Sequence, residues 1–182
     1  MSNDYGRGYK VYSKTLFLDD LHLERQTLVN NACCYAIRDH LHYMTSLSLI
    51  DTCVTDLGIE VITTNAGNLR ALRIGENCFR PQNIKGVCLN SIAQKCNRLE
   101  KLHAFSVKMD DTKLVPLCRN LAQLRELHLG ACGRVSRTGI QELTEKCGNL
   151  TELRLYGCPS LRDCHLDVMA TKMPALRRLE IF

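Results

Sequence analysis

One apolar pattern recurs along the chain at a nearly constant interval, and it constrains the fold more than any other feature of the sequence. The pattern is L-x-x-L-x-L with conservative replacements, and it occurs six times. The copies are Met44/Leu47/Leu49, Leu69/Leu72/Ile74, Leu99/Leu102/Ala104, Leu124/Leu127/Leu129, Leu150/Leu153/Leu155 and Leu176/Leu179/Ile181. Their first residues lie 25, 30, 25, 26 and 26 positions apart, which indicates a chain built from stacked structural repeats.

Each repeat is expected to form one short strand followed by one helix. The alternating L-x-L part predicts a strand with one buried face. In the segment that follows, Ile59 and Ile62 lie one helical turn apart behind a capping Asp56, and Ile140 and Leu143 repeat this spacing. A single unit cannot bury its own apolar face, so the units should stack. The sequence therefore predicts a right-handed α/β solenoid, or horseshoe, with a parallel sheet on the concave face and helices on the convex face.

The repeats define one domain, which we expect to cover residues 15–182 and to contain about six to seven repeats. A seventh, weaker copy of the pattern is expected at Leu16/Leu18. Residues 1–14 are expected to form an N-terminal tail.

The composition is that of a soluble globular protein, with 45% hydrophobic and 24% charged residues among 182. No apolar run approaches the roughly 18 residues of a membrane span, and the first residues lack the apolar core of a secretion signal. We therefore expect a cytoplasmic protein without a membrane partner, with the nucleus and the cytoskeleton as alternatives. A net charge of +5 is mildly basic and falls short of the footprint of a nucleic-acid binder.

Eleven cysteines require an explanation, because an odd number without a secretion signal argues against a disulfide scaffold. Several of them occupy fixed repeat positions. The position three residues before the first leucine of each copy holds Leu41, Ala66, Cys96, Leu121, Cys147 and Met173. A cysteine that alternates with Leu, Ala and Met is expected to be a small packing residue.

These repeats resemble the cysteine-containing subtype of leucine-rich repeat, which is typical of F-box/LRR substrate receptors of ubiquitin ligases. The subtype pattern, L-x-x-L-x-L-x-x-C-x-x-I-T-D-x-G-I-x-x-L, runs here from Leu150 to Met169 through Cys158, and from Leu124 to Leu143 through Cys132. The resemblance covers about residues 41–182. It implies a leucine-rich-repeat fold and a protein-recognition role, although no three-helix F-box is found before the repeats.

The middle residues of the L-x-L strands, and the residues two positions before and after them, are expected to face the concave surface. The partner-binding residues predicted in this way are Arg73, His103, His128, Arg154, Phe105, Tyr156, Lys101 and Phe182. They would form a basic stripe flanked by aromatic side chains. Such a surface suits a protein partner that carries acidic or phosphorylated side chains beside an apolar anchor.

Catalysis, cofactors and metal are not expected. The sequence contains no Gly-rich phosphate loop and no paired-carboxylate motif. His103 and His128 should be neighbours on adjacent strands, but the repeat offers no third and fourth ligand for zinc.

Two functions remain open at the level of sequence. The first is a recognition module like the substrate-reading part of an F-box/LRR receptor. The second is a structural subunit of a large cytoskeletal (for example axonemal) or ribonucleoprotein assembly, and in either case the chain is expected to belong to a larger complex.

Overall fold

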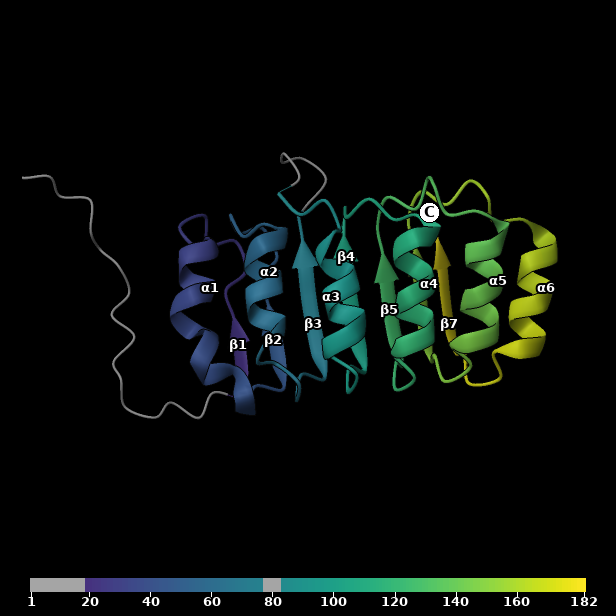
Figure 1. The fold of residues 1–182 in the computed structure, drawn as a ribbon. Helices are drawn as coiled ribbons and strands as arrows, with labels where there is room; N and C mark the ends of the chain where they lie inside the picture. Colours follow the sequence, from purple (N-terminus) through teal and green to yellow (C-terminus); the bar gives the residue numbers. More distant parts are fainter. Residues whose placement is uncertain (1–18, 77–82) are drawn as a thin grey trace, which may run out of the picture.

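Seven strands form one parallel sheet in the computed structural model, which describes residues 19–76 and 83–182 (Figure 1). The strands are β1 (Asp20–His22), β2 (Ser46–Ser48), β3 (Ala71–Gly75), β4 (Lys101–Phe105), β5 (Glu126–Leu129), β6 (Glu152–Leu155) and β7 (Arg178–Ile181). Each strand pairs only with the strands before and after it in the sequence. This order is the one expected when identical strand–helix units stack.

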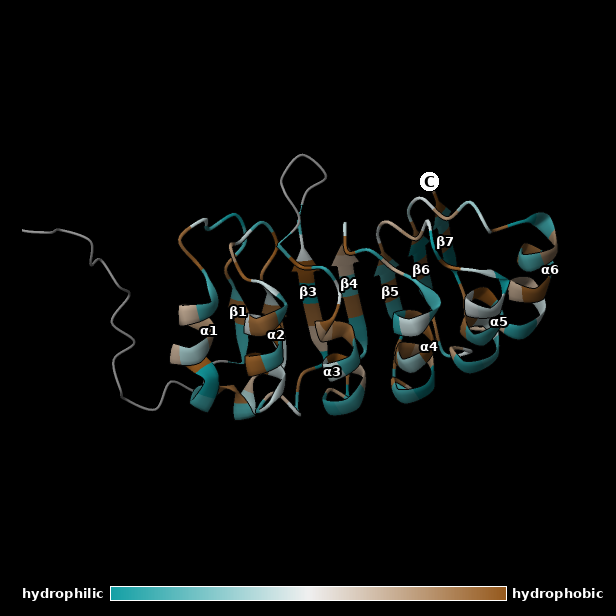
Figure 2. Ribbon diagram, turned by 45° about the horizontal axis from the view of Figure 1, so that its top comes forward, coloured by the Kyte–Doolittle hydropathy of each residue, from teal (hydrophilic) through white to brown (hydrophobic). Residues whose placement is uncertain are grey.

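The helices cover one face of the sheet and leave the other face open (Figures 1 and 2). They are α1 (Asn31–Ile37), the 3-10 helix η1 (Arg38–Tyr43), α2 (Asp56–Thr63), α3 (Cys88–Lys95), α4 (Asp111–Asn120), α5 (Arg137–Lys146) and α6 (Asp163–Lys172). The predicted right-handed α/β solenoid, with its sheet on the concave side, is confirmed. Within the described residues, no helix has the length and apolar character needed to cross a membrane.

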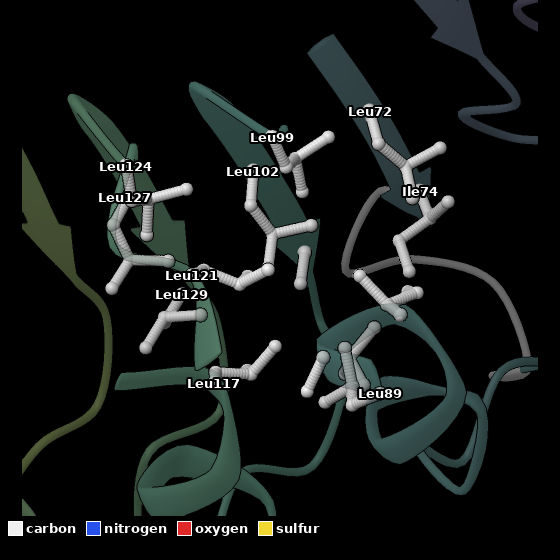
Figure 3. Close-up of a cluster of buried hydrophobic side chains, with 14 of the residues drawn as sticks. Leu72, Ile74, Leu89, Leu99, Leu102, Leu117, Leu121, Leu124, Leu127 and Leu129 are labelled. Carbon is white, nitrogen blue, oxygen red and sulfur yellow. The ribbon is translucent and has the colours of Figure 1, made fainter. Parts of the chain in front are cut away.

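The strand leucines predicted from the repeat share one continuous row across the sheet. The row runs through Leu47, Leu72, Leu102, Leu127, Leu153 and Leu179. Figure 3 shows Leu72, Leu102 and Leu127 turned toward the same interior as the helix residues Leu89 and Leu117. All five are fully buried, and each such side chain stabilises the fold by about 2 kcal/mol.

The first repeat starts later than the sequence predicts. Leu21 in β1 lies opposite Leu47 in β2 and takes the position that was expected for the weak copy at Leu16/Leu18. The register predicted for this repeat is therefore wrong, because Leu21, 26 positions before Leu47, continues the regular interval. Residues 16 and 18, like the predicted tail at 1–14, lie outside the described residues.

The recurrent position before each strand is buried, as the sequence predicts. Its occupants are Leu41, Ala66, Cys96, Leu121, Cys147 and Met173. Burial raises the pKa of Cys96 to about 11, and burial together with the nearby Cys158 raises the pKa of Cys132 to about 12. These thiols stay protonated and pack as small apolar groups. The cysteines of the described residues are all free of disulfide bonds.

A polar side chain at the start of one helix caps the start of the next helix at three places in the solenoid. Asn31 in α1 accepts the backbone N–H of Thr55 at 2.9 Å. Asp56 in α2 accepts three backbone N–H groups at or just before the start of α3, at 2.7–3.0 Å. Asp111 in α4 accepts the N–H of Ser136, the N-cap of α5, at 2.8 Å. The unpaired N–H groups of a helix N-terminus are thus satisfied by the preceding repeat.

Candidate functional site

The residues predicted to bind a partner lie on or beside the strands of the sheet. Arg73 is in β3, Lys101, His103 and Phe105 are in β4, His128 is in β5, Arg154 is in β6, and Tyr156 and Phe182 follow β6 and β7. The strand register aligns Arg73, His103, His128 and Arg154 in a single row. The sequence therefore gives the correct order of side chains across this face.

A pair of stacked histidines occupies the centre of the row. The rings of His103 and His128 are nearly parallel, with centroids 3.7 Å apart, and Phe105 meets both rings edge-on. Burial, followed by the charges of His128 and Arg73, lowers the pKa of His103 to about 4. Among the described residues, neither ring nitrogen of His103 has a hydrogen-bond partner, although Nε2 lies 3.6 Å from Glu126 Oε2, so the imidazole is held mainly by its ring contacts.

The stacked geometry does not suit a shared metal ion. Ring nitrogens donate in the plane of the imidazole, and the two rings lie in parallel planes, so their lone pairs do not converge on one point. Across residues 19–76 and 83–182, no group of three or more His, Cys, Asp or Glu side chains could hold a metal ion.

Carboxylates lie beside the basic residues of the row. Arg73 Nη1 lies 2.9 Å from Glu24 Oε1, and Glu24 follows β1. Lys101 Nζ lies 2.6 Å from Glu126 Oε1 on the adjacent strand. In the expected basic stripe, Arg73 and Lys101 are therefore members of ion pairs.

The same pairing continues on β6 and β7. Glu152 Oε1 accepts hydrogen bonds from Arg154 Nε at 2.7 Å and from His128 Nε2 at 2.9 Å. Although burial raises the pKa of Glu152, these two hydrogen bonds outweigh it and lower the pKa below its usual value. Glu180 lies between Arg154 and Arg178, at 3.2 and 2.7 Å. Sequence analysis did not assign these glutamates to the site, although their alternate positions on the strands could have indicated them.

A groove of about 620 Å³, here called the strand-end groove, lies at the carboxyl ends of the strands. Its lining comprises Glu24, Arg25, Ile50, Asp51, Arg73, Glu76, Phe105, Ser106, Gly130, Ala131, Tyr156 and Gly157. Among the predicted residues, Arg73, Phe105 and Tyr156 line this groove. The lining also contains the small residues Gly130, Ala131 and Gly157, whose side chains occupy little space in the groove.

A second aromatic contact extends the surface beyond the groove. The rings of Tyr156 and Phe182 stack with centroids 4.7 Å apart, and Phe182 is 67% exposed. Phe182 therefore presents one ring face to solvent next to the groove, although it does not line it. Lys101, His103, His128 and Arg154 also lie outside the lining.

Comparison with known proteins identifies the class of fold. No family model matches the chain. Among solved structures, the chain is similar to an internalin of Listeria monocytogenes, a leucine-rich-repeat protein, with 18% identity and a TM-score of 0.51. The similarity covers 79% of this chain and 44% of the internalin, so the chain spans less than half the length of that protein.

The protein is thus an α/β leucine-rich-repeat solenoid. At this level of identity the likeness to the internalin concerns the fold alone. The finer resemblance to F-box/LRR receptors rests on the sequence pattern alone, and these comparisons do not confirm it.

Proposed function

We propose that the chain is a non-enzymatic module that recognises a protein partner on the concave face of its sheet. The observation that carries this proposal is the strand-end groove, whose lining combines the aromatic side chains of Phe105 and Tyr156 with the small residues Gly130, Ala131 and Gly157. Aromatic side chains next to a concavity bury a large area at low entropic cost, and such residues dominate binding energy at protein interfaces.

The ion pairs around the groove support recognition by a preformed surface. Arg73 is held by Glu24, and Arg154 is held by Glu152 and Glu180 before any partner arrives. Fixing these long side chains in advance lowers the entropic cost of association.

The pairing also bears on the chemistry of the partner. The acidic or phosphorylated partner expected from the sequence would have to displace glutamates from their arginine and lysine neighbours. We therefore propose that an apolar side chain of the partner enters the groove, and that charged groups of both signs surround it. An acidic partner is the second proposal, and it would depend on Arg73 and Arg154.

The sequence resemblance to F-box/LRR receptors supports a substrate-recognition role, which we propose for the cytoplasm. A structural subunit of a cytoskeletal or ribonucleoprotein assembly is the alternative. The two roles differ in the stability of the complex. Gel filtration of cell extract at low and high salt separates a small, salt-sensitive recognition complex from a large, salt-resistant assembly.

Photo-crosslinking tests which face binds. A photoreactive amino acid at Tyr156 should capture the partner, whereas the same group at Gln94, exposed on the opposite side in α3, should not. With the captured partner purified, Tyr156→Ala should weaken binding about tenfold or more, as expected for an aromatic anchor. Gln94→Ala is the matched control. Equal capture from both positions, or unchanged affinity of Tyr156→Ala, would remove the concave face from consideration.

A further inference from the structure

The N-terminus of α6 differs from the capped helix starts described above. At α2, α3 and α5, the first residue of the preceding helix supplies an oxygen that accepts N–H groups. The corresponding first residue of α5, which precedes α6, is Arg137. A helix N-terminus already carries partial positive charge, and a guanidinium cannot accept a hydrogen bond. The position held by a carboxylate between α4 and α5 is held by a cation between α5 and α6.

A hollow of about 290 Å³ opens at this point, where α5 and α6 lie side by side (Figure 1). We call it the α5–α6 hollow. Its lining consists of Ser136, Arg137, Ser160, Arg162, Cys164 and His165. The lining contains two guanidinium groups and no carboxylate. Within the described part of the chain, no ion pair is formed by Arg137 or Arg162.

His165 supplies a buried donor at the same hollow. The residue is only 8% exposed. Its Nδ1 accepts the backbone N–H of Arg162 at 3.0 Å, which leaves Nε2 to carry the ring proton. Residues 19–76 and 83–182 offer no hydrogen-bond acceptor to the buried Nε2–H. Buried donors are nearly always satisfied, and this one lacks an acceptor beside two unpaired arginines.

We propose that the α5–α6 hollow binds an oxyanion, and that its ligand is a phosphate group. A phosphate would stand where the carboxylate of Asp111 stands at the start of α5. Its several acceptor oxygens match donors that arrive from two guanidinium groups, the His165 Nε2–H and the helix N-terminus. The hollow lies on the helix side of the solenoid, so this proposal is independent of the partner surface on the sheet.

NMR titration of the whole chain with inorganic phosphate tests the proposal, at constant pH and with ionic strength held constant by sodium chloride. We expect saturable shifts of the His165 side-chain nitrogens and of the backbone amides at the start of α6. Arg162→Ser should weaken phosphate binding about tenfold, as expected for one lost charge-assisted hydrogen bond. Arg177→Ser removes an equal charge from an exposed position elsewhere and should leave the affinity unchanged.

A second variant separates a ligand contact from a structural role. In His165→Asn, the side-chain oxygen can still accept the Arg162 N–H, but the Nε2–H donor is lost. We expect weaker phosphate binding at an almost unchanged unfolding temperature. Shifts that do not saturate, or equal affinities of the Arg162→Ser and Arg177→Ser proteins, would overturn the proposal.

Two further probes define the source of the phosphate. Tighter binding of phosphoserine than of inorganic phosphate would support a phosphate carried on a peptide, and equal binding would support a free phosphate group. Acetate that binds as tightly as phosphate would contradict the assignment, because a carboxylate offers only two oxygens to the donors of the hollow.

Discussion

The imidazole of His103 lies flat against that of His128, with ring planes 9° apart, in the middle of the concave face. No residue in the described part of the chain forms a hydrogen bond with either nitrogen of His103, and Arg73 lies in the same row. A proton on His103 would be poorly solvated and close to positive groups, and the attraction of Glu126, whose Oε2 lies 3.6 Å from Nε2, does not outweigh these effects. The face is built around a histidine that the fold keeps neutral.

Stability should fall as the pH is lowered from about 6.5 to about 4. The pKa of His103 is about 4 in the folded chain, below its ordinary value of 6.5, so the unfolded chain binds more protons within this interval. When the pH is lowered from 7.5 to 4.5, the free energy of unfolding measured with urea should fall less for His103→Phe than for the unchanged protein. A His103 resonance that titrates with a midpoint above pH 6 would contradict the assignment.

Leu102→Ala should lower the free energy of unfolding by about 2–5 kcal/mol, because Leu102 is fully buried in the central strand and truncation leaves a cavity. Leu57→Ala is the matched control, since Leu57 is half exposed on α2. Its effect should stay within about 0.5 kcal/mol. Chemical denaturation measures the free energy of unfolding of both variants. A similar decrease for Leu102→Ala and Leu57→Ala would show that the leucine row is not the core.

Gly75→Ala should destabilise the chain and should also disturb the strand-end groove. Gly75 has φ of 101°, and a Cβ there would lie 1.9 Å from the carbonyl oxygen of Phe105. The cost should exceed about 1 kcal/mol, because the backbone of β4 must move. Gly67→Ala is the control, since nothing lies within 4 Å of an added Cβ at that position. A Gly75→Ala protein as stable as the Gly67→Ala protein would contradict the close approach of β3 and β4.

Asp56→Ala should cost about 2 kcal/mol, because it removes the acceptor for three N–H groups at the start of α3. Burial raises the pKa of Asp56, but the N–H groups that it accepts outweigh burial and lower the pKa below its usual value. Its contribution should persist above pH 4 and be lost as acid protonates the carboxylate. The difference in unfolding temperature between Asp56→Ala and the unchanged protein should therefore be larger at pH 7 than at pH 3. Asp167→Ala, exposed on α6, should match the unchanged protein at both pH values.

The fold could be predicted because the repeat fixes which side of each strand is buried. Once Leu72, Leu102 and Leu127 are aligned by their spacing, the register of the sheet and the row that contains His103 follow directly. For the first repeat, the spacing was matched to the wrong leucines. The Leu16/Leu18 pair satisfies the local alternation as well as Leu21 does, and only the distance to Leu47 distinguishes them.

The electrostatics of the candidate site could be predicted only in part. Spacing brings Glu152 near Arg154, but whether the two side chains pair depends on rotamers that a pattern does not specify. The sequence pattern also did not reveal that the first residue of α5, which would cap the start of α6, is not a carboxylate. Arg137 becomes notable only when Asp56 and Asp111 are seen to cap the helix of the following repeat.

Because the strands pair in sequence order, local unfolding can begin at one repeat and spread to the next. Each repeat is supported only by its two neighbours, so opening can proceed inward from either flank without breaking the centre. Leu179 and Ile181 in β7 are partly exposed, whereas Leu102 and Leu127 are fully enclosed. Amide hydrogen exchange under native conditions should accordingly be slowest in β4 and β5 and become faster toward β7, giving a gradient along the solenoid.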